Sequence, residues 1–245
     1  MLTDQPITTI AALSDLVESE FKADKVTTIL YRGHGAASYV LRPKVGRHLP
    51  PENSTSKEVN EKLMLELFRR QSVDRISIAD ADDWELLAIA QHHGLATRLL
   101  DWTRSPLVAL YFAVCFECET RSKDKDSEGR PMREDAEIIA WRCPKIDLTK
   151  LLPKEGPFAI GETIRYVPRI VTPRLRAQRG VFTVHPNPTE EFRPKGGECF
   201  RIRIPYEKRK HLKDSLYRHG IHEEVLFPDL DGLARHIQWC QTKGY

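Results

Sequence analysis

The sequence WELLAIAQHHGLATRLLDWTRSPLVALYFA, residues 84–113, contains the elements that decide the fold. Apolar side chains at helical spacing predict a helix over residues 84–93. Asp82 or Asp83 is suited to cap its start, and Gly94 is suited to end it. Ser105 followed by a proline then begins a segment that is apolar on nearly every side, which predicts a second, central helix over residues 106–118. The residues between the two helices predict a polar connector.

Outward from this stretch, the apolar pattern predicts further helices and several strands. Helices are expected over residues 11–23, 57–71 and 206–219, with a last one from Asp229 or Asp231, and strands over residues 26–31, 136–142, 164–167, 181–185 and 199–204. A flexible polar turn is expected at residues 32–35. Because helices dominate the first half and strands the second, the fold class is α+β: a mixed, largely antiparallel sheet with N-terminal and central helices packed on it.

Composition limits the function. The chain has 245 residues, with 38 Lys and Arg against 35 Asp and Glu, so its formal charge is only +3. A protein that wraps a polyanion carries a stronger field, so any anion site must be local. The five scattered cysteines and the absence of a signal-peptide pattern or of a long apolar run predict a cytoplasmic protein without membrane contact. We expect a single domain over residues 1–245, with a solvated loop at 121–135.

Tyr31-Arg32-Gly33 is the first candidate site. An arginine after a buried strand, beside a glycine that admits a ligand, suits an anion because guanidinium forms bidentate pairs with phosphate. The alternative is that Arg32 forms a structural ion pair.

The second candidate site combines the end of the first helix with the connector. Its residues with polar groups are Gln91, His92, His93, Thr97, Arg98, Asp101, Trp102 and Thr103. A helix C-terminus raises the pKa of nearby histidines, which makes them good donors. The alternative is that the histidines cap carbonyl groups and that Arg98 pairs with Asp101 to hold the connector.

The third candidate site is a basic patch at residues 169–179, whose arginines are Arg169, Arg174, Arg176 and Arg179. Phosphate groups suit such a patch, although a solvated surface explains it equally well. Metal ligation is not expected elsewhere: Asp229 and Asp231 are better explained as helix caps, and Cys115 and Cys118 as core thiols.

These clusters, in this order, resemble the FRG domain family, which is named for an aromatic-Arg-Gly motif. The likeness also includes LRPKVGR at residues 41–47, AQRGVF at 177–182 and LFPDLDGLA at 226–234, and it spans about residues 28–238. A weaker likeness connects the chain to ADP-ribosyltransferases, in which an arginine at the end of a strand grips NAD.

That second likeness implies an enzyme: an NAD-using ADP-ribosyltransferase or NAD glycohydrolase that acts as a toxin or antiphage effector. NAD is then the substrate, no metal is needed, and a protein or nucleic acid is the acceptor. The implied catalytic residues are Arg32, His93, Asp101, Gln178 and Glu224. The implied ligand-binding residues are Tyr31, Gly33, Arg47, His92, Thr97, Arg98, Trp102 and Arg176. Gln178 stands where a glutamate is expected, so Asp101, Glu223 and Glu224 are the alternative carboxylates.

Two other function classes stay open. A non-catalytic module would sense a nucleotide or a phage component through Arg32, Arg98 and the basic patch. A metal-dependent nuclease would use Asp101, His92 or His93, and Asp229.

Overall fold

A six-stranded antiparallel sheet is the centre of the computed structural model, which describes residues 6–21, 24, 26–48, 59–73, 81–115, 133–145, 152–169, 172–194 and 198–242. The strand order is β4-β5-β2-β1-β3-β6. The strands are β1 (Thr27–His34), β2 (Leu99–Thr103), β3 (Ala136–Pro144), β4 (Ile164–Tyr166), β5 (Gly180–Val184) and β6 (Cys199–Ile204). The predicted α+β class is confirmed, and the described strand pairs are all antiparallel.

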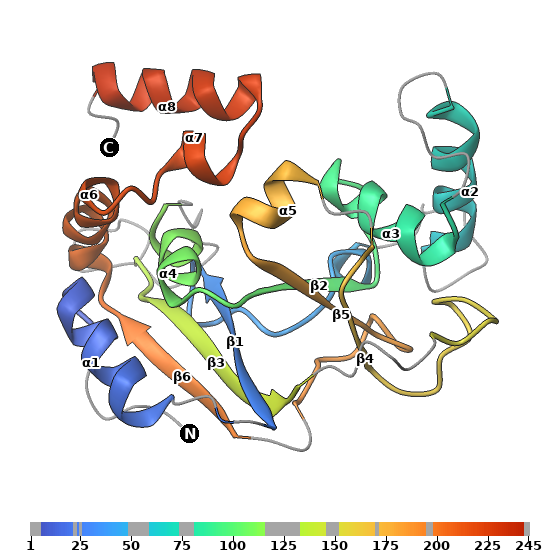
Figure 1. Cartoon of the computed structure of the whole chain (residues 1–245), viewed down its shortest axis with the longest axis horizontal. Coiled ribbons are helices and arrows are strands. Elements are labelled where there is room, and N and C mark those ends of the chain that lie inside the picture. The colour runs from blue at the N-terminus through green and yellow to red at the C-terminus, as the bar shows by residue number, and fades with distance from the viewer. Residues whose placement is uncertain are drawn as a thin grey trace.

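The sheet consists of two three-stranded halves with a narrow join. β1 pairs with β3 along its whole length, and β2 pairs with β5 likewise. Between β1 and β2, in contrast, only Tyr31 and Thr103 are in register. The two halves therefore diverge on either side of this pair, as Figure 1 shows.

Helices α1 (Ile10–Glu20), α4 (Pro106–Val114) and α6 (Arg209–Arg218) cover the β1-β3-β6 half. Ser105 caps α4 as predicted, because its side chain accepts from the Val108 N–H. Leu110 at the centre of α4 is fully buried. Gly33 of β1 lies directly under α4, where a Cβ would collide with the Ala109 carbonyl oxygen. The motif glycine thus permits close packing of helix on strand.

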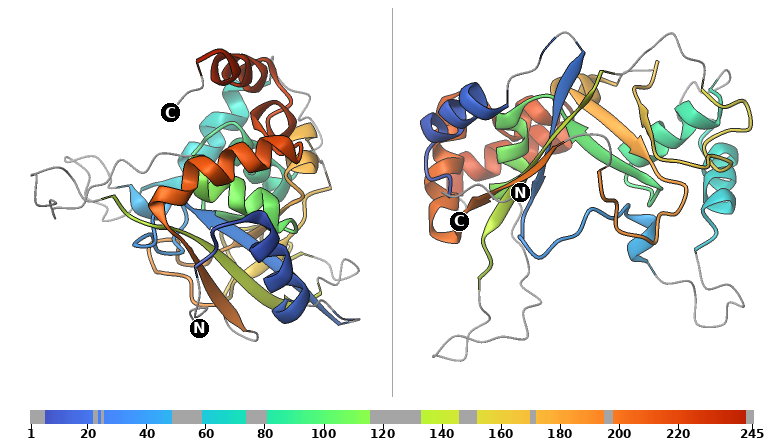
Figure 2. Two further views of the ribbon diagram at one scale, coloured as in Figure 1. Left: turned by 90° about the vertical axis from the view of Figure 1, so that its left-hand side faces the viewer. Right: turned by 90° about the horizontal axis from the view of Figure 1, so that it is seen from below.

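Helices α2 (Glu61–Gln71) and α3 (Asp83–His92) cover the other half, at the opposite end of the sheet (Figure 2). The side chain of Asp82 accepts from the Glu85 N–H and caps α3. Gly94 follows the helix with φ of 91°, the left-handed conformation that glycine adopts without strain. Both ends of α3 therefore agree with the sequence.

The second face of the sheet carries an aromatic cluster in place of helices. Trp102 and Trp141 lie 5.5 Å apart between ring centres, and Phe192 from a later loop packs on both. Leu41 closes the same cluster. Loops thus cover this face.

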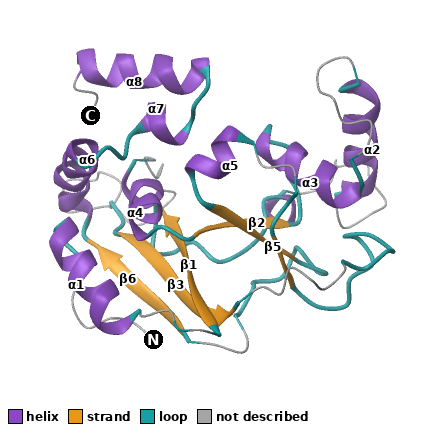
Figure 3. Cartoon of the chain, viewed as in Figure 1, coloured by secondary structure: helices purple, strands orange, loops and turns teal. Residues whose placement is uncertain are grey.

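The three remaining helices are α5 (Pro173–Ala177), α7 (Glu223–Leu226) and α8 (Leu230–Thr242). Helices α7 and α8 lie next to one another, apart from the strands (Figure 3). The short 3-10 helices η1 (Val45–Arg47) and η2 (Tyr206–Lys208) complete the described elements.

The structure corrects two local predictions. Arg32, Gly33 and His34 belong to β1 and not to a flexible turn, because β3 pairs with each of them. The predicted connector contains β2, whose partner β5 lies about eighty residues further along the chain. Most of the predicted loop at 121–135 falls outside the described residues, as do residues 57–58 and 116–118 of two predicted helices. Within the described part of the chain, none of the helices has both the length and the apolar character needed to cross a bilayer.

Candidate functional site

A pocket of about 390 Å³ opens where β1 and β2 diverge. This volume lies within the range of roughly 300–1,000 Å³ that is typical of small-molecule sites. Its polar lining comprises Arg32, Lys44, Arg47, Gln91, Asp101, Thr103, Arg174 and Gln178, and its apolar lining includes Tyr31, Leu95, Phe112, Leu175 and Phe182. Residues between positions 31 and 182 thus meet at the divergence of the two strands.

Arg32 spans the gap between the two strands. Its Nη1 donates to the Asp101 carbonyl oxygen at 2.5 Å and lies 3.8 Å from the Asp101 carboxylate, while its Nε donates to His34 at 3.2 Å. Burial removes water from the guanidinium and lowers the pKa of Arg32 to about 10, against the opposing effect of Asp101. A fixed, poorly hydrated arginine binds an anionic group with little loss of hydration or side-chain entropy.

A buried chain of hydrogen bonds orients the Arg32 side chain. The Nε2 of His34 accepts from Arg32, so its Nδ1 carries the proton toward Glu137 at 3.3 Å. Glu137 also accepts from Arg201 at 2.7 Å. Burial lowers the pKa of His34 to about 4, which keeps the ring neutral at pH 7. His34 therefore orients Arg32 without adding charge.

Gln91 positions the Asp101 carboxylate. Its amide Nε2 donates to Asp101 Oδ2 at 3.0 Å, and its amide oxygen accepts from the Thr97 hydroxyl at 2.5 Å. Thr97 is fully buried, so it fixes which way the amide points. The Asp101 side chain itself is 62% exposed and lines the pocket. A carboxylate that is oriented and reachable is suited to contact a bound ligand.

The other cations of the pocket donate hydrogen bonds to neutral carbonyl groups, which do not cancel their charge. Lys44 donates to the Gly94 carbonyl, Arg47 to the Arg42 carbonyl, and Arg174 to the His92 carbonyl while stacking over the Phe227 ring at 4.5 Å. Burial lowers the pKa of both Arg47 and Arg174. Among the described residues of the lining, these three and Arg32 are the cations, and Asp101 is the single carboxylate. The local charge matches a ligand with more than one negative group.

Gln178 is in the pocket but is already engaged. Its Nε2 donates to the Leu226 carbonyl of α7 at 3.0 Å, and its backbone oxygen accepts from Thr103. Gln178 therefore connects the pocket wall to α7, and its side chain lacks the charge of a catalytic carboxylate.

Arg98 lies away from the pocket. The expected Arg98–Asp101 pair does not form: Arg98 binds Glu61 at 2.8 Å and stacks over Phe158, while Asp101 faces Arg32. The pairing prediction was wrong because the actual partner, Glu61, belongs to α2, and the sequence does not show that α2 packs beside Arg98.

The rings of His92 and His93 are in edge-to-face contact, with 4.8 Å between their centres, but they line different cavities. His92 lines a smaller neighbouring cavity that shares Gln91, Asp101 and Arg174 with the main pocket. Its pKa is lowered by burial and by nearby positive charge, contrary to the increase expected from the helix end. His93 lies in a separate apolar hollow beside Met64 and Leu67.

Some of the other predicted site residues border the pocket, and others lie outside it. Tyr31, Gly33 and Trp102 border the pocket, although the Trp102 indole is buried on the opposite face and donates to Thr183. Arg176 is exposed on α5 and is absent from the described lining. Glu224 lies on α7, near His236. Asp229 accepts from the Gly232 N–H and so acts at the start of α8.

Sequence reasoning missed Lys44, and it included Gln91 and Arg174 in candidate clusters without assigning either a role in the site. Gln91 precedes the His-His pair and Arg174 belongs to the basic patch, so both were within segments already singled out. Lys44 lies inside LRPKVGR. All three residues lie within segments that the motifs had singled out. That they meet in one pocket can be seen only once the strands of the sheet are in place.

Comparison with protein families gives one match. The family model described as FRG domain matches residues 27–124. The chain carries an FRG domain. The matched part of the FRG domain runs from β1 beyond α4 and supplies Arg32, Lys44, Arg47, Gln91 and Asp101. Arg174 and Gln178 come from beyond it. Comparison with curated proteins and with solved structures each returned no match.

Proposed function

We propose that the pocket binds NAD and that the FRG domain protein breaks the bond between nicotinamide and ribose, transferring ADP-ribose to a protein or nucleic acid, or to water. The observation that carries this proposal is that four cations and one oriented carboxylate, Asp101, line the same pocket. Arg32 and Arg174 bind the pyrophosphate, since guanidinium matches phosphate oxygens in charge and shape. Such chemistry suits a toxin or an antiphage effector that consumes NAD or modifies a target.

Asp101 replaces the glutamate that position 178 lacks. In the reaction, the C1′–nitrogen bond breaks and its electron pair leaves with nicotinamide. Positive charge develops on the ribose ring, where the Asp101 carboxylate stabilises it. The acceptor then donates an electron pair to C1′ and loses its proton to Asp101. Glu223 and Glu224 are less suited, because neither belongs to the described lining of the pocket.

The test separates binding from turnover. We expect NAD to bind the purified protein in calorimetry and nicotinamide to be released, with label from the adenylate part of NAD transferred to lysate protein or nucleic acid when transfer is the reaction. Asp101→Asn should reduce turnover by roughly 100-fold or more and leave NAD binding in place. The matched control is Asp15→Asn, on the exposed face of α1, which should behave as the unmodified protein.

Two arginines of α5 provide a matched pair of variants that tests how much a pocket cation contributes to NAD binding. Arg174→Gln should weaken NAD binding by roughly 10–100-fold, the equivalent of one charge-assisted hydrogen bond. Arg176→Gln should change it less than about twofold, since Arg176 is exposed outside the pocket lining.

The outcomes distinguish the function classes. Saturable, salt-sensitive NAD binding without nicotinamide release would overturn the transferase and favour a nucleotide-sensing module. Nucleic-acid cleavage that disappears with chelator would favour a nuclease. Absence of both binding and release would reject the NAD proposal altogether.

A further inference from the structure

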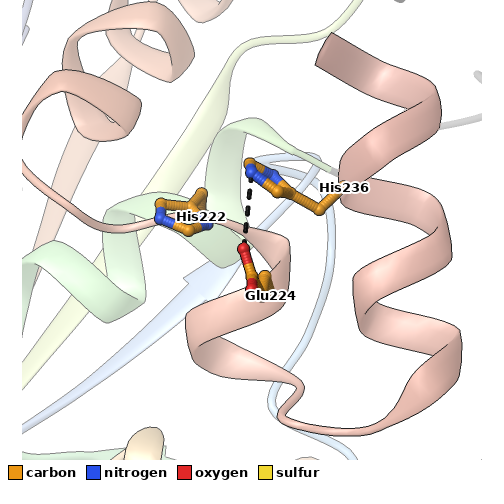
Figure 4. A group of neighbouring side chains, drawn as sticks. All are labelled: His222, Glu224 and His236. Carbon is orange, nitrogen blue, oxygen red and sulfur yellow. Dashed lines mark ion pairs between the residues drawn. The ribbon is translucent and has the colours of Figure 1, made fainter. Parts of the chain in front are cut away.

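His222, Glu224 and His236 form a side-chain cluster away from the pocket. One ligand-type atom from each lies within 4.8 Å of the others. Figure 4 shows the two imidazole rings and the carboxylate turned toward one another, with His236 contributed by α8 and Glu224 by α7. Two imidazoles and a carboxylate are a donor set that Zn²⁺ prefers.

The two histidines have unsatisfied ring nitrogens. The Nδ1 atoms of His222 and His236 are both buried and have no hydrogen-bond partner among the described residues. His236 is only 9% exposed. Buried polar atoms are ordinarily paired, because an unpaired one loses its hydration without compensation. A cation coordinated by the Nδ1 of His222 would satisfy that atom, whereas His236 offers its other nitrogen, Nε2, which lies beside Glu224.

The distances around His236 agree with zinc geometry. Its Nε2 lies 3.7 Å from Glu224 Oε2 and 3.6 Å from the Sγ of Cys240, one helical turn further on. In a tetrahedral site, zinc bonds of about 2.0–2.3 Å place neighbouring ligand atoms roughly 3.3–3.8 Å apart. The rings of His222 and His236 stack, with 4.3 Å between their centres and 21° between their planes, so sharing one ion also requires rotation of an imidazole about its χ2 bond. Cys240 lies beside His236 as a further donor.

Few apolar side chains hold helix α8: Trp239 is half-buried and packs on Tyr217, with 5.1 Å between ring centres. Gly232 and His236 are its buried residues, whereas Leu230 is 82% and Ile237 is 52% exposed. Its inward face is thus built around a histidine. Arg235 adds an ion pair to Glu223 at 2.6 Å, but that pair is partly exposed. A metal shared between α7 and α8 would add a stronger attachment.

We propose that His222, Glu224 and His236 bind one Zn²⁺ ion that fixes α8 to α7. The role is structural, and it differs from the sequence-based expectation that no metal is bound. It also reaches the pocket, since the Leu226 carbonyl of α7 accepts from Gln178. Zinc would hold this pocket wall in place, independently of which ligand the pocket takes.

The experiment uses the full-length protein, freed of metal with a chelator and then titrated with Zn²⁺ by calorimetry. We expect one Zn²⁺ per chain, a higher Tm with zinc, and a tetrahedral Co²⁺ absorption spectrum when cobalt replaces it. His236→Ala and His222→Ala should each weaken Zn²⁺ binding by at least about 10-fold, since a metal ligand is lost. His211→Ala, at an exposed position of α6, should leave it unchanged.

Folding is controlled separately. Circular dichroism checks each variant, and Glu224→Gln provides a substitution at an exposed position that keeps both imidazoles. It should also weaken Zn²⁺ binding at least severalfold. Failure of the metal-free protein to take up Zn²⁺, or unchanged uptake by folded His236→Ala and Glu224→Gln, would overturn the proposal and leave the His236–Glu224 contact as an ion pair only. Neither readout depends on NAD.

Discussion

Arg98 and Glu61, 37 residues apart in sequence, form a buried ion pair in which the arginine Nε donates at 2.8 Å and the arginine backbone N–H donates at 2.5 Å. Arg98 also donates to the carbonyls of Pro157 and His185. One side chain thus connects α2, β2 and two later loops. The arginine that sequence analysis assigned to ligand binding instead holds the scaffold around the pocket.

Arg98→Ala should strongly destabilise the protein. Removing one partner leaves the Glu61 carboxylate buried and unpaired, which typically costs about 3–5 kcal/mol. Urea denaturation followed by circular dichroism measures the loss. Arg176→Ala, at an exposed position, is the control and should change the free energy of unfolding by less than about 0.5 kcal/mol. A loss below about 1 kcal/mol for Arg98→Ala would contradict the role assigned to the pair.

Gly33→Ala should disrupt the packing of α4 on β1. The added Cβ would collide with the Ala109 carbonyl oxygen and lie 2.6 Å from the Ala113 nitrogen. Both are backbone atoms of a central helix, so relief requires a backbone shift that costs about 1–3 kcal/mol or more. Thermal denaturation measures it. Gly161→Ala, where a Cβ meets nothing within 4 Å, should be neutral, and equal Tm values for the two variants would refute the packing argument.

Stability should fall as pH decreases from about 6.5 to 4. Burial lowers the pKa of His34 and of His185 to about 4, so the unfolded chain binds more protons than the folded chain in this window. The stabilisation is fully present above the unfolded pKa and is lost as pH falls through the folded one. For His34 the effect is on the order of 1–3 kcal/mol.

The contribution of His34 to this pH dependence can be isolated by substitution. Unfolding free energies across a pH series should show a shallower slope for His34→Gln than for the unmodified protein. His211→Gln, at an exposed position, should keep the original slope. Identical slopes in all three proteins would mean that His34 titrates normally in the folded state.

Leu110→Asp should unfold the protein. Leu110 is fully buried in α4 between the sheet and neighbouring helices, and an unpaired buried carboxylate costs several kcal/mol. Leu230→Asp is the matched change at a position that is 82% exposed and should remain folded. Near-ultraviolet circular dichroism and cooperative melting distinguish the two, and a cooperative melt of Leu110→Asp near the original Tm would contradict the position of the helix.

Local signals in the sequence were sufficient for most helices and for several strands. Asp82, Ser105 and Gly94 mark helix ends through interactions within a few residues, which sequence spacing reveals directly. β2 escaped prediction because Asp101 interrupts its apolar pattern and because its pairing with β5 depends on distant residues. Strands of this kind become visible only through their partners.

The α+β class, the FRG motifs and the concentration of arginines within an almost neutral chain can be read from the sequence alone. Which arginines line the pocket depends on how the elements pack. Arg32 and Arg174 reach the pocket because β1 and β2 diverge there, whereas Arg98 meets Glu61. His222 lies beside His236 because α7 and α8 pack on one another. A side chain's type is written locally, but its partner is set by packing between elements far apart in the chain.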